Sequence, residues 1–443
     1  MKTIRIGCGA GYSGDRIDPA VELAAQGSIA YLVFECLAER TIALAQKARL
    51  LDPAAGYDPL LEERMEAVLP LCSTNKIRIV SNMGAANPIA AAQRTRDIAR
   101  RLGIRGMRIA AVSGDDVLTA IRCGRPSLPG GELDGLPPSK IVSANAYLGA
   151  EPIAEALAAG ADIVLTGRIA DPSMFVGILM HEFRWPTDNW NLLGQGTVVG
   201  HLLECAGQLT GGYFADPDYN DVEGLAHLGF PIAEVSADGC TVISKVEGSG
   251  GIITSATCTE QLLYEIQDPS AYLTPDVIAD FSHVSVEEIG ADRIRVSGGR
   301  GKPRPDTLKV SVGYHDGYVG EGQISYAGPG ALARARLAKA ILTERLSDCA
   351  LTELRFDFIG INAILGDKLS SGGAEPYELR LRAAGRSESC KAASMIPREV
   401  EALYTNGPAS GGGVTGSTKE TIGILSALIP RSEVATAIHY EVS

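Results

Sequence analysis

Two pairs of side chains have the types and the spacing that proton transfer requires. Glu35 and Glu39 stand four residues apart where a predicted helix begins, which would place both carboxylates on one helix face. His201 and Glu204 stand three residues apart in a second predicted helix and would also share a face. Crowded carboxylates raise each other's pKa, and a histidine beside a carboxylate can transfer protons. Both pairs are candidates for acid–base catalysis; the alternatives are an acidic first helical turn and a structural histidine.

A glycine-rich loop near the N-terminus is a second candidate site. Gly9–Gly14 has the form G-x-G-x-x-G, follows a predicted strand and precedes Glu35 by about twenty residues, as in a dinucleotide-binding fingerprint. Asp15 directly follows the loop and would place a negative charge beside a pyrophosphate. The loop is therefore predicted to bind a substrate or a carboxylate, with an NAD(P)-dependent oxidoreductase and a plain tight turn as the alternatives. Its candidate binding residues are Gly9, Gly11, Ser13 and Gly14.

Arg168 is a candidate anion-binding residue. It follows the apolar run Asp162–Thr166 after Gly167, a residue that lets a ligand approach the backbone. A planar guanidinium binds a carboxylate or a phosphate through two parallel hydrogen bonds. Asp171 lies three residues further on, so a structural ion pair between the two side chains is the alternative.

A parallel sheet is expected to position these residues. The first 170 residues alternate short apolar runs with amphipathic stretches, and strands that are apolar throughout indicate a sheet covered by helices on both faces. The carboxyl ends of such strands meet at one edge, where α/β enzymes usually hold their active sites. An open doubly wound sheet and a barrel-like arrangement both fit this α/β pattern. The predicted strands are Ile4–Gly7, Ala30–Phe34, Ile77–Ser81, Met107–Val112, Ile141–Ser143 and Asp162–Thr166.

Amides and glycines after the predicted strands and helices extend the candidate site. Helix caps and turns favour the same residue types, which is the structural alternative. A cluster of carboxylates could also bind a divalent cation such as Mg²⁺, although no ligand spacing requires one. Asp15 and Asp171 are further candidate catalytic residues, and the candidate metal ligands are Asp15, Glu35 and Asp171. The candidate substrate-binding residues outside the loop are Asn82, Asn87, Asn145, Gly211 and Gly212.

The overall composition narrows the class of protein. The 443 residues carry a formal net charge of −13, which argues against non-specific binding to nucleic acid or to an anionic membrane. No apolar run reaches the roughly 18 to 20 residues of a spanning helix, and the N-terminus lacks a signal-peptide pattern. Nine scattered cysteines without C-x-x-C spacing argue against a disulfide framework and a zinc cluster. We therefore expect a cytoplasmic protein, homo-oligomeric, with a small molecule as its partner.

The sequence pattern also predicts two domains. Residues 1–275 are expected to form the α/β domain that carries the active site, and residues 276–443 a smaller α+β domain. The boundary is placed where predicted strands begin to alternate with helices in a different pattern. Two glycine-rich loops, Gly248–Gly251 and Gly411–Gly413, resemble anion-binding nests only weakly.

Six runs of the chain resemble one known family, the acyclic terpene utilisation (AtuA-like) family, formerly a domain of unknown function. The resemblance covers most of residues 1–350. The runs are Gly9–Arg16 (GAGYSGDR), Phe34–Thr41 (FECLAERT), Ala144–Ala150 (ANAYLGA), Gly160–Pro172 (GADIVLTGRIADP), Gly200–Tyr213 (GHLLECAGQLTGGY) and Gln261–Pro269 (QLLYEIQDP).

The resemblance implies a place in the breakdown of branched acyl-CoA esters, with hydration or carbon–carbon cleavage of a hydroxyacyl-CoA as the associated chemistry. Together with the carboxylates and Arg168, it leads us to expect a lyase or hydro-lyase on a carboxylated or CoA-linked small molecule. Longer relatives carry an additional ferredoxin-like domain, so a small partner subunit of that fold is a further expectation. The non-enzymatic alternative is a scaffold subunit of a two-component enzyme.

Overall fold

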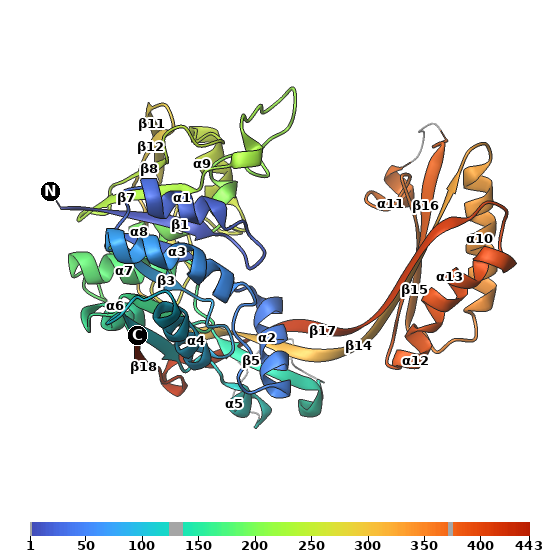
Figure 1. Cartoon of the computed structure of the whole chain (residues 1–443), viewed down its shortest axis with the longest axis horizontal. Helices are drawn as coiled ribbons and strands as arrows, with labels where there is room; N and C mark the ends of the chain where they lie inside the picture. Colours follow the sequence, from blue (N-terminus) through green and yellow to red (C-terminus); the bar gives the residue numbers. More distant parts are fainter. Residues whose placement is uncertain (1, 124–135, 371–374) are drawn as a thin grey trace. The chain divides into compact units, whose positions relative to one another are not determined.

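The chain forms two compact units in the computed structural model, which describes residues 2–123, 136–370 and 375–443 (Figure 1). Unit 1 comprises Met1–Gly313 with Ile424–Ser443, and unit 2 comprises Tyr314–Gly423. The boundary expected near residue 275 lies inside unit 1 instead. The reason is that strands from both sides of that position pair in one sheet.

A ten-stranded mixed sheet forms the centre of unit 1, in the order β11-β12-β8-β7-β1-β2-β3-β6-β4-β18. The order is linear, so the sheet is open and does not form a barrel. Its middle strands are parallel and almost wholly buried, which explains their unbroken apolar sequences. These are β1 (Thr3–Ala10), β2 (Tyr31–Phe34), β3 (Arg78–Ser81), β6 (Ile163–Thr166) and β4 (Arg108–Ser113). The predicted α/β class is confirmed.

Antiparallel strands extend the sheet at both edges, which the sequence pattern did not indicate. β7 pairs with β1 in antiparallel register, and β18, at the C-terminus of the chain, pairs in the same way with β4. The antiparallel strands are β7 (Pro231–Ser236), β8 (Thr241–Lys245), β11 (Ser285–Gly290), β12 (Arg293–Ser297) and β18 (Ala437–Val442).

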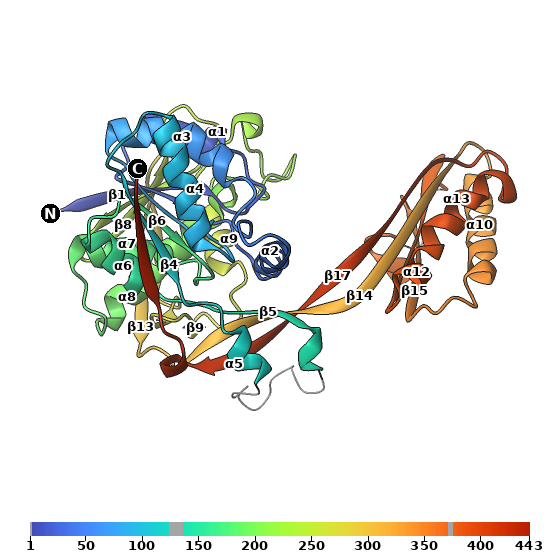
Figure 2. The same ribbon diagram turned by 60° about the horizontal axis from the view of Figure 1, so that its bottom comes forward.

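Helices pack on both faces of the parallel strands (Figure 2). α1, α3 and α4 pack side by side in one layer, and α6, α7 and α8 pack in another. The helices of unit 1 are α1 (Asp18–Gln26), α2 (Glu39–Leu51), α3 (Leu61–Asn75), α4 (Pro88–Arg101), α5 (Leu118–Arg122), α6 (Glu151–Ala158), α7 (Ser173–Phe183), α8 (Trp190–Leu203) and α9 (Ser255–Leu263). Short 3-10 turns lie at Pro138–Lys140, Ala206–Gln208, Leu225–His227 and Arg431–Glu433.

The segment around Ile141–Ser143 forms a strand, β5 (Ile141–Ala146), but β5 is not part of the large sheet. It pairs with the long strand β14 (Thr307–Ala327). Buried side chains of β5, β14 and β17 (Gly412–Pro430) form a small core of their own. A further small sheet contains β9 (Tyr272–Leu273), β10 (Ile278–Asp280) and β13 (Arg300–Lys302), and packs against α8.

Unit 2 is an α+β unit with its own core. Its sheet has the order β15-β16-β14-β17, and α10 and α13 contact β16. β16 alternates between buried Leu379, Leu381 and Ala383 and less buried arginines, as expected for a sheet with one covered face. The remaining elements are α10 (Ala331–Arg345), β15 (Glu353–Ile359), α11 (Gly366–Leu369), β16 (Glu378–Ser387), α12 (Cys390–Ala393) and α13 (Met395–Asn406). Across the described ranges, no helix has the length and apolar character needed to span a bilayer.

Candidate active site

A cavity of about 1220 Å³ lies in unit 1, where the segments that follow β1, β2 and β6 meet. This volume exceeds that of most pockets for a drug-sized ligand. Its wall contains many ionisable side chains, and these come from segments far apart in the sequence. They include Asp15, Arg16, Glu35, Glu39, Tyr147, Arg168, Asp171, His201, Glu204, Glu265 and Lys309.

The cavity brings together eight of the fifteen predicted site residues. Those that line it are Gly11, Asp15, Glu35, Arg168, Asp171, His201, Glu204 and Gly212. Those that do not line it are Gly9, Ser13, Gly14, Asn82, Asn87, Asn145 and Gly211. The first group contains every predicted acid–base residue, whereas the second contains only predicted binding residues.

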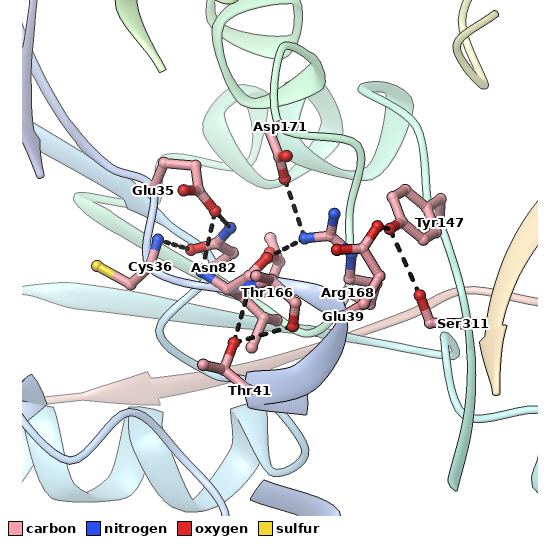
Figure 3. A network of polar contacts seen from close by, with 12 residues as sticks. Glu35, Cys36, Glu39, Thr41, Asn82, Tyr147, Thr166, Arg168, Asp171 and Ser311 are labelled. Atoms are coloured by element: carbon pink, nitrogen blue, oxygen red, sulfur yellow. Dashed lines mark hydrogen bonds and ion pairs between the residues drawn. The ribbon is translucent and has the colours of Figure 1, made fainter. Parts of the chain in front are cut away.

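Glu35 is held at the cavity wall by two hydrogen-bond donors (Figure 3). Its Oε1 accepts the Leu37 N–H at 2.9 Å and the Asn82 Nδ2 at 2.9 Å. The Asn82 amide is oriented by the Cys36 N–H, which donates to its Oδ1 at 2.7 Å. Burial, together with the nearby charge of Asp171, raises the pKa of Glu35 to about 8. Because Oε1 already accepts two donors, the proton of the neutral acid must lie on Oε2.

The expected shared helix face of Glu35 and Glu39 is wrong. α2 begins at Glu39, so Glu35 lies in the extended segment before the helix. Asn82 also has a different role from the predicted one, because it contacts Glu35 and not the cavity.

Arg168 uses one edge of its guanidinium for the protein and leaves the other without a partner. Nη1 donates to the Leu37 carbonyl and to Asp171 Oδ1, the latter at 2.9 Å, so the ion pair considered from the sequence is present. Nε is buried without a hydrogen-bond partner, and no hydrogen bond from Nη2 is found in the part of the chain that the structure describes. Nε and Nη2 form the side-on fork that binds a carboxylate in two parallel hydrogen bonds.

Tyr147, Glu39 and Lys309 complete the surroundings of Arg168, and of these three sequence reasoning selected only Glu39. The Tyr147 ring lies between two cations, with Arg168 Cζ 4.0 Å and Lys309 Nζ 4.9 Å from its centroid. Its hydroxyl donates to Glu39, which also pairs with Lys309 at 3.1 Å. Burial raises the pKa of Glu39, but the Tyr147 hydrogen bond and Arg168 outweigh it and lower the pKa to about 2. Glu39 is therefore a fixed anion.

His201 and Glu204 meet at the end of α8, as their spacing predicted. His201 Nδ1 lies 2.9 Å from Glu204 Oε1. The rings of Tyr272 and Phe281 lie tilted against the imidazole, with centroids 5.5 and 5.6 Å away. Burial lowers the pKa of His201 to about 4. Burial, with the charges of Asp171 and Glu265, raises the pKa of Glu204 well above its ordinary value.

The glycine-rich loop does not have the geometry of a dinucleotide site. Asp15 Oδ2 accepts the Gly11 N–H at 2.9 Å. This backbone N–H is therefore already used by a carboxylate and cannot donate to a phosphate. α1 begins only at Asp18, beyond the last glycine. Gly9 instead permits close packing, because a Cβ there would lie 2.8 Å from the Phe34 ring. Gly14 is exposed at the outer side of the loop.

The buried Arg64 donates hydrogen bonds to the backbone of the glycine-rich loop. Its Nη2 donates to the Ser13 carbonyl at 2.7 Å and to the Tyr12 and Asp15 carbonyls at 3.4 and 3.3 Å. Its Nη1 pairs with the buried Asp58 at 3.1 Å. Ser13 therefore contributes its backbone to the loop and not its side chain to the cavity.

We predict that Arg64→Met lowers the free energy of unfolding by roughly 3–5 kcal/mol, because it leaves the buried Asp58 carboxylate unpaired. Urea denaturation of the wild type and the variant measures this loss. The double variant Arg64→Met/Asp58→Leu should recover part of the loss, since no buried charge remains. Equal losses in the single and double variants would contradict this explanation.

The other predicted binding residues have structural roles. Asn87 caps α4 by accepting the Ala90 N–H, and its amide donates to the Pro53 and Ala55 carbonyls. Asn145 donates to the buried Asp115, which in turn accepts the Arg168 N–H at 2.9 Å. Asn145 is thus linked to the Arg168 backbone through Asp115 and does not line the cavity.

The glycines of the remaining loops are also structural. Gly211 adopts a positive φ of 100° and packs against Val222. The loop Gly248–Gly251 is closed by Lys245, which donates to the Ser249 carbonyl at 2.7 Å and pairs with Asp292 at 3.2 Å. The positive charge of Lys245 is therefore already neutralised by Asp292.

A divalent-cation site at Asp15, Glu35 and Asp171 stays a prediction. Both carboxylate oxygens of Asp15 accept backbone N–H groups, from Gly11 and Arg16. Within residues 2–123, 136–370 and 375–443, no three His, Cys, Asp or Glu side chains form a group that could hold a metal ion. Glu35 and Asp171 are the two candidate ligands that influence each other's charge.

A comparison with known protein families identifies the chain. The model of the family described as "Acyclic terpene utilisation family protein AtuA" matches residues 4–440. The chain belongs to the acyclic terpene utilisation family. Neither the curated proteins nor the solved structures contain a significant match. All six runs that resemble this family contribute side chains to the cavity, among them Asp15, Glu35, Tyr147, Arg168, His201 and Glu265.

Proposed function

We propose that this member of the acyclic terpene utilisation family is a lyase or hydro-lyase that acts on a carboxylated or CoA-linked small molecule. The observation that carries the proposal is the pairing, in one cavity, of a neutral acid with an anion-binding fork. Glu35 accepts both of its hydrogen bonds on Oε1, which leaves Oε2 to carry the proton of a neutral acid, and the Nε–Nη2 edge of Arg168 has no partner among the described residues. The family name supports acyclic terpene compounds as the class of substrate.

In this proposal Arg168 and Glu35 have separate roles in a dehydration. Arg168 binds a carboxylate or another anionic group of the substrate and thereby orients it. A basic side chain of the cavity removes a proton from the carbon next to the carbonyl group, and the electron pair of that bond forms the double bond. The neighbouring hydroxyl group leaves as water with the Glu35 proton, which leaves Glu35 as a carboxylate. Hydration is the reverse, and carbon–carbon cleavage uses the same acid on a different leaving group.

The alternative of an NAD(P)-dependent oxidoreductase receives less support from the site. Asp15 occupies the Gly11 N–H and adds negative charge where a pyrophosphate would bind. The proposal needs no redox cofactor, although coenzyme A enters as part of the substrate. A divalent cation at Glu35 and Asp171 would need both side chains as carboxylates, so it is an alternative to the acid role of Glu35.

We expect the purified chain to exchange the carbon-bound proton of a 3-hydroxyacyl compound and to form the alkene. The test incubates the protein in D₂O with 3-hydroxybutyrate and with 3-hydroxybutyryl-CoA and follows the proton NMR signals of substrate and alkene. Glu63→Gln, which changes an exposed glutamate on α3, is the control variant. A nicotinamide fluorescence change without any exchange would favour the oxidoreductase. Activity only after addition of a second protein would favour the scaffold subunit.

A further inference from the structure

The His201–Glu204 pair has two buried polar atoms without partners. His201 Nδ1 and Glu204 Oε1 contact each other at 2.9 Å, which leaves His201 Nε2 and Glu204 Oε2 as the outer atoms of the pair. Both outer atoms are buried and have no hydrogen-bond partner among the residues that the structure describes, and both residues line the cavity. A buried polar atom without a partner is costly, so such atoms in a cavity wall point to a ligand that supplies the missing hydrogen bonds.

The surroundings keep the pair in place and favour its uncharged state. The rings of Tyr272 and Phe281 pack against the imidazole in a tilted arrangement, and Gln261 donates to the His201 carbonyl at 3.0 Å. The charges that influence the pair include the carboxylates of Asp171 and Glu265 and the Arg168 guanidinium. Burial lowers the pKa of His201 to about 4 and raises the pKa of Glu204 well above its ordinary value. Both shifts favour a neutral imidazole beside a carboxylic acid.

Such a neutral pair has two arrangements of its protons. In the first, Nδ1–H donates to Oε1, Nε2 is an acceptor, and Oε2 carries the carboxylic proton. In the second, Oε1–H donates to Nδ1, Nε2–H is a donor, and Oε2 is an acceptor. The two arrangements differ only in the position of protons, and the net charge is zero in both.

We propose that His201 and Glu204 act together as a proton relay that accepts a proton at Nε2 and releases one from Oε2. The substrate class that fits is a carbonyl or thioester compound with a hydrogen on the adjacent carbon. The inference rests on the proposed function for the identity of the reaction, because the relay supplies the base that removes the carbon-bound proton.

The relay step balances without any other reagent. Nε2 takes the proton from the carbon, and the electron pair of the C–H bond forms the carbon–carbon double bond of an enol. The carbonyl π electrons move to oxygen, which takes the Oε2 proton, while the Nδ1 proton moves to Oε1. The pair ends in its second arrangement, and no charge builds up in the buried site. An enol is the species from which a β-hydroxyl group can leave, and it is the product that carbon–carbon cleavage of a β-hydroxyacyl compound releases.

The first test measures the protonation of the His201 ring directly and needs no substrate. Nitrogen NMR of the full chain labelled with ¹⁵N-histidine reports the protonation of each ring nitrogen, and His201→Gln identifies the His201 signals among the six histidines. We expect both nitrogens of His201 to show shifts between those of protonated and unprotonated nitrogen, because two arrangements exchange. Glu204→Gln should leave one tautomer. An imidazolium at neutral pH, or the same single tautomer in both proteins, would overturn the proposal.

The second test measures transfer to a substrate. Solvent deuterium exchange into 3-hydroxybutyryl-CoA should slow by at least about 100-fold in Glu204→Gln and in His201→Gln. Glu260→Gln, an exposed glutamate on α9, is the matched control and should exchange at the wild-type rate. Unchanged exchange in both cavity variants would overturn the relay. Two tautomers at His201 without exchange in the wild type would instead contradict the proposed function and leave the relay's geometry supported.

Discussion

Glu35→Gln should lower turnover by about 10²–10⁴-fold while the protein stays folded. The glutamine amide oxygen can accept the same two hydrogen bonds, from the Leu37 N–H and from Asn82. What the variant loses is the proton on Oε2, which the proposed mechanism gives to the leaving group. Turnover of the wild type should fall as the pH rises through about 8, since the pKa of Glu35 is raised to about 8, mainly by burial.

The same variant should gain stability at neutral pH. Between the ordinary pKa of 4.5 and about 8, the unfolded chain has released the Glu35 proton but the folded chain retains it. Folding therefore takes up a proton, so the wild type loses stability as the pH rises through this window. Above about pH 8 both states are ionised and no further loss follows. Glutamine does not titrate, so the melting temperature of Glu35→Gln should exceed that of the wild type increasingly from pH 4.5 to 8.

Thermal melts and rate measurements across this pH range check both halves of the prediction. Glu63→Gln is the control, because its parent side chain is exposed. A variant that is less active and also less stable at every pH would show that Glu35 has a structural role. A variant with wild-type turnover would exclude Glu35 as the acid.

Arg168→Lys should weaken binding of a dicarboxylate probe, malonate, by at least about tenfold. Lysine keeps the positive charge and can still reach Asp171, but it has no planar fork to replace Nε and Nη2. Arg168→Ala should weaken binding further, since the loss of a buried charge-assisted pair costs about 2–5 kcal/mol. Isothermal titration calorimetry with malonate measures both effects.

Both changes at Arg168 should also lower the melting temperature, and a third variant separates the two roles. The guanidinium is buried, contacts the Leu37 carbonyl and stacks on Tyr147, so its removal leaves groups unpaired. Asp171→Asn removes the ion pair but leaves the Nε–Nη2 edge intact, so it should retain malonate binding. Titrations are made below the melting temperature of the least stable variant, with Arg295→Lys as a surface control.

The opposite pattern would show that Arg168 is structural. In that case Arg168→Lys would bind malonate as the wild type does, and Asp171→Asn would lose as much stability as Arg168→Lys. The variants can separate the two roles because the two edges of the guanidinium have different surroundings. One edge is used by the protein fold, and the other has no partner within the described residues.

Some residues of the candidate site could be predicted from the sequence, and others could not. Glu35 directly follows β2, and Arg168 and Asp171 lie two and five residues after the end of β6. Strand ends of a parallel sheet converge, so the proximity of these residues could be expected. Tyr147 and Lys309 were not selected, because their partners come from distant segments. Lys309 pairs with Glu39 across 270 residues, and no local spacing indicates such a contact.

The sequence by itself determined the class of the fold, the short buried strands and the acids at their ends. Buried parallel strands must be apolar throughout, and the chain therefore shows them as short apolar runs such as Ala30–Phe34 and Asp162–Thr166. Tertiary structure alone decided how the other strands pair. β18 joins β4, and β5 joins β14, because strand pairing depends on hydrogen bonds between segments that are remote in sequence. It likewise decided that Asp15 accepts the Gly11 N–H and that one edge of Arg168 has no partner within the described ranges, since both depend on atoms that only folding brings together.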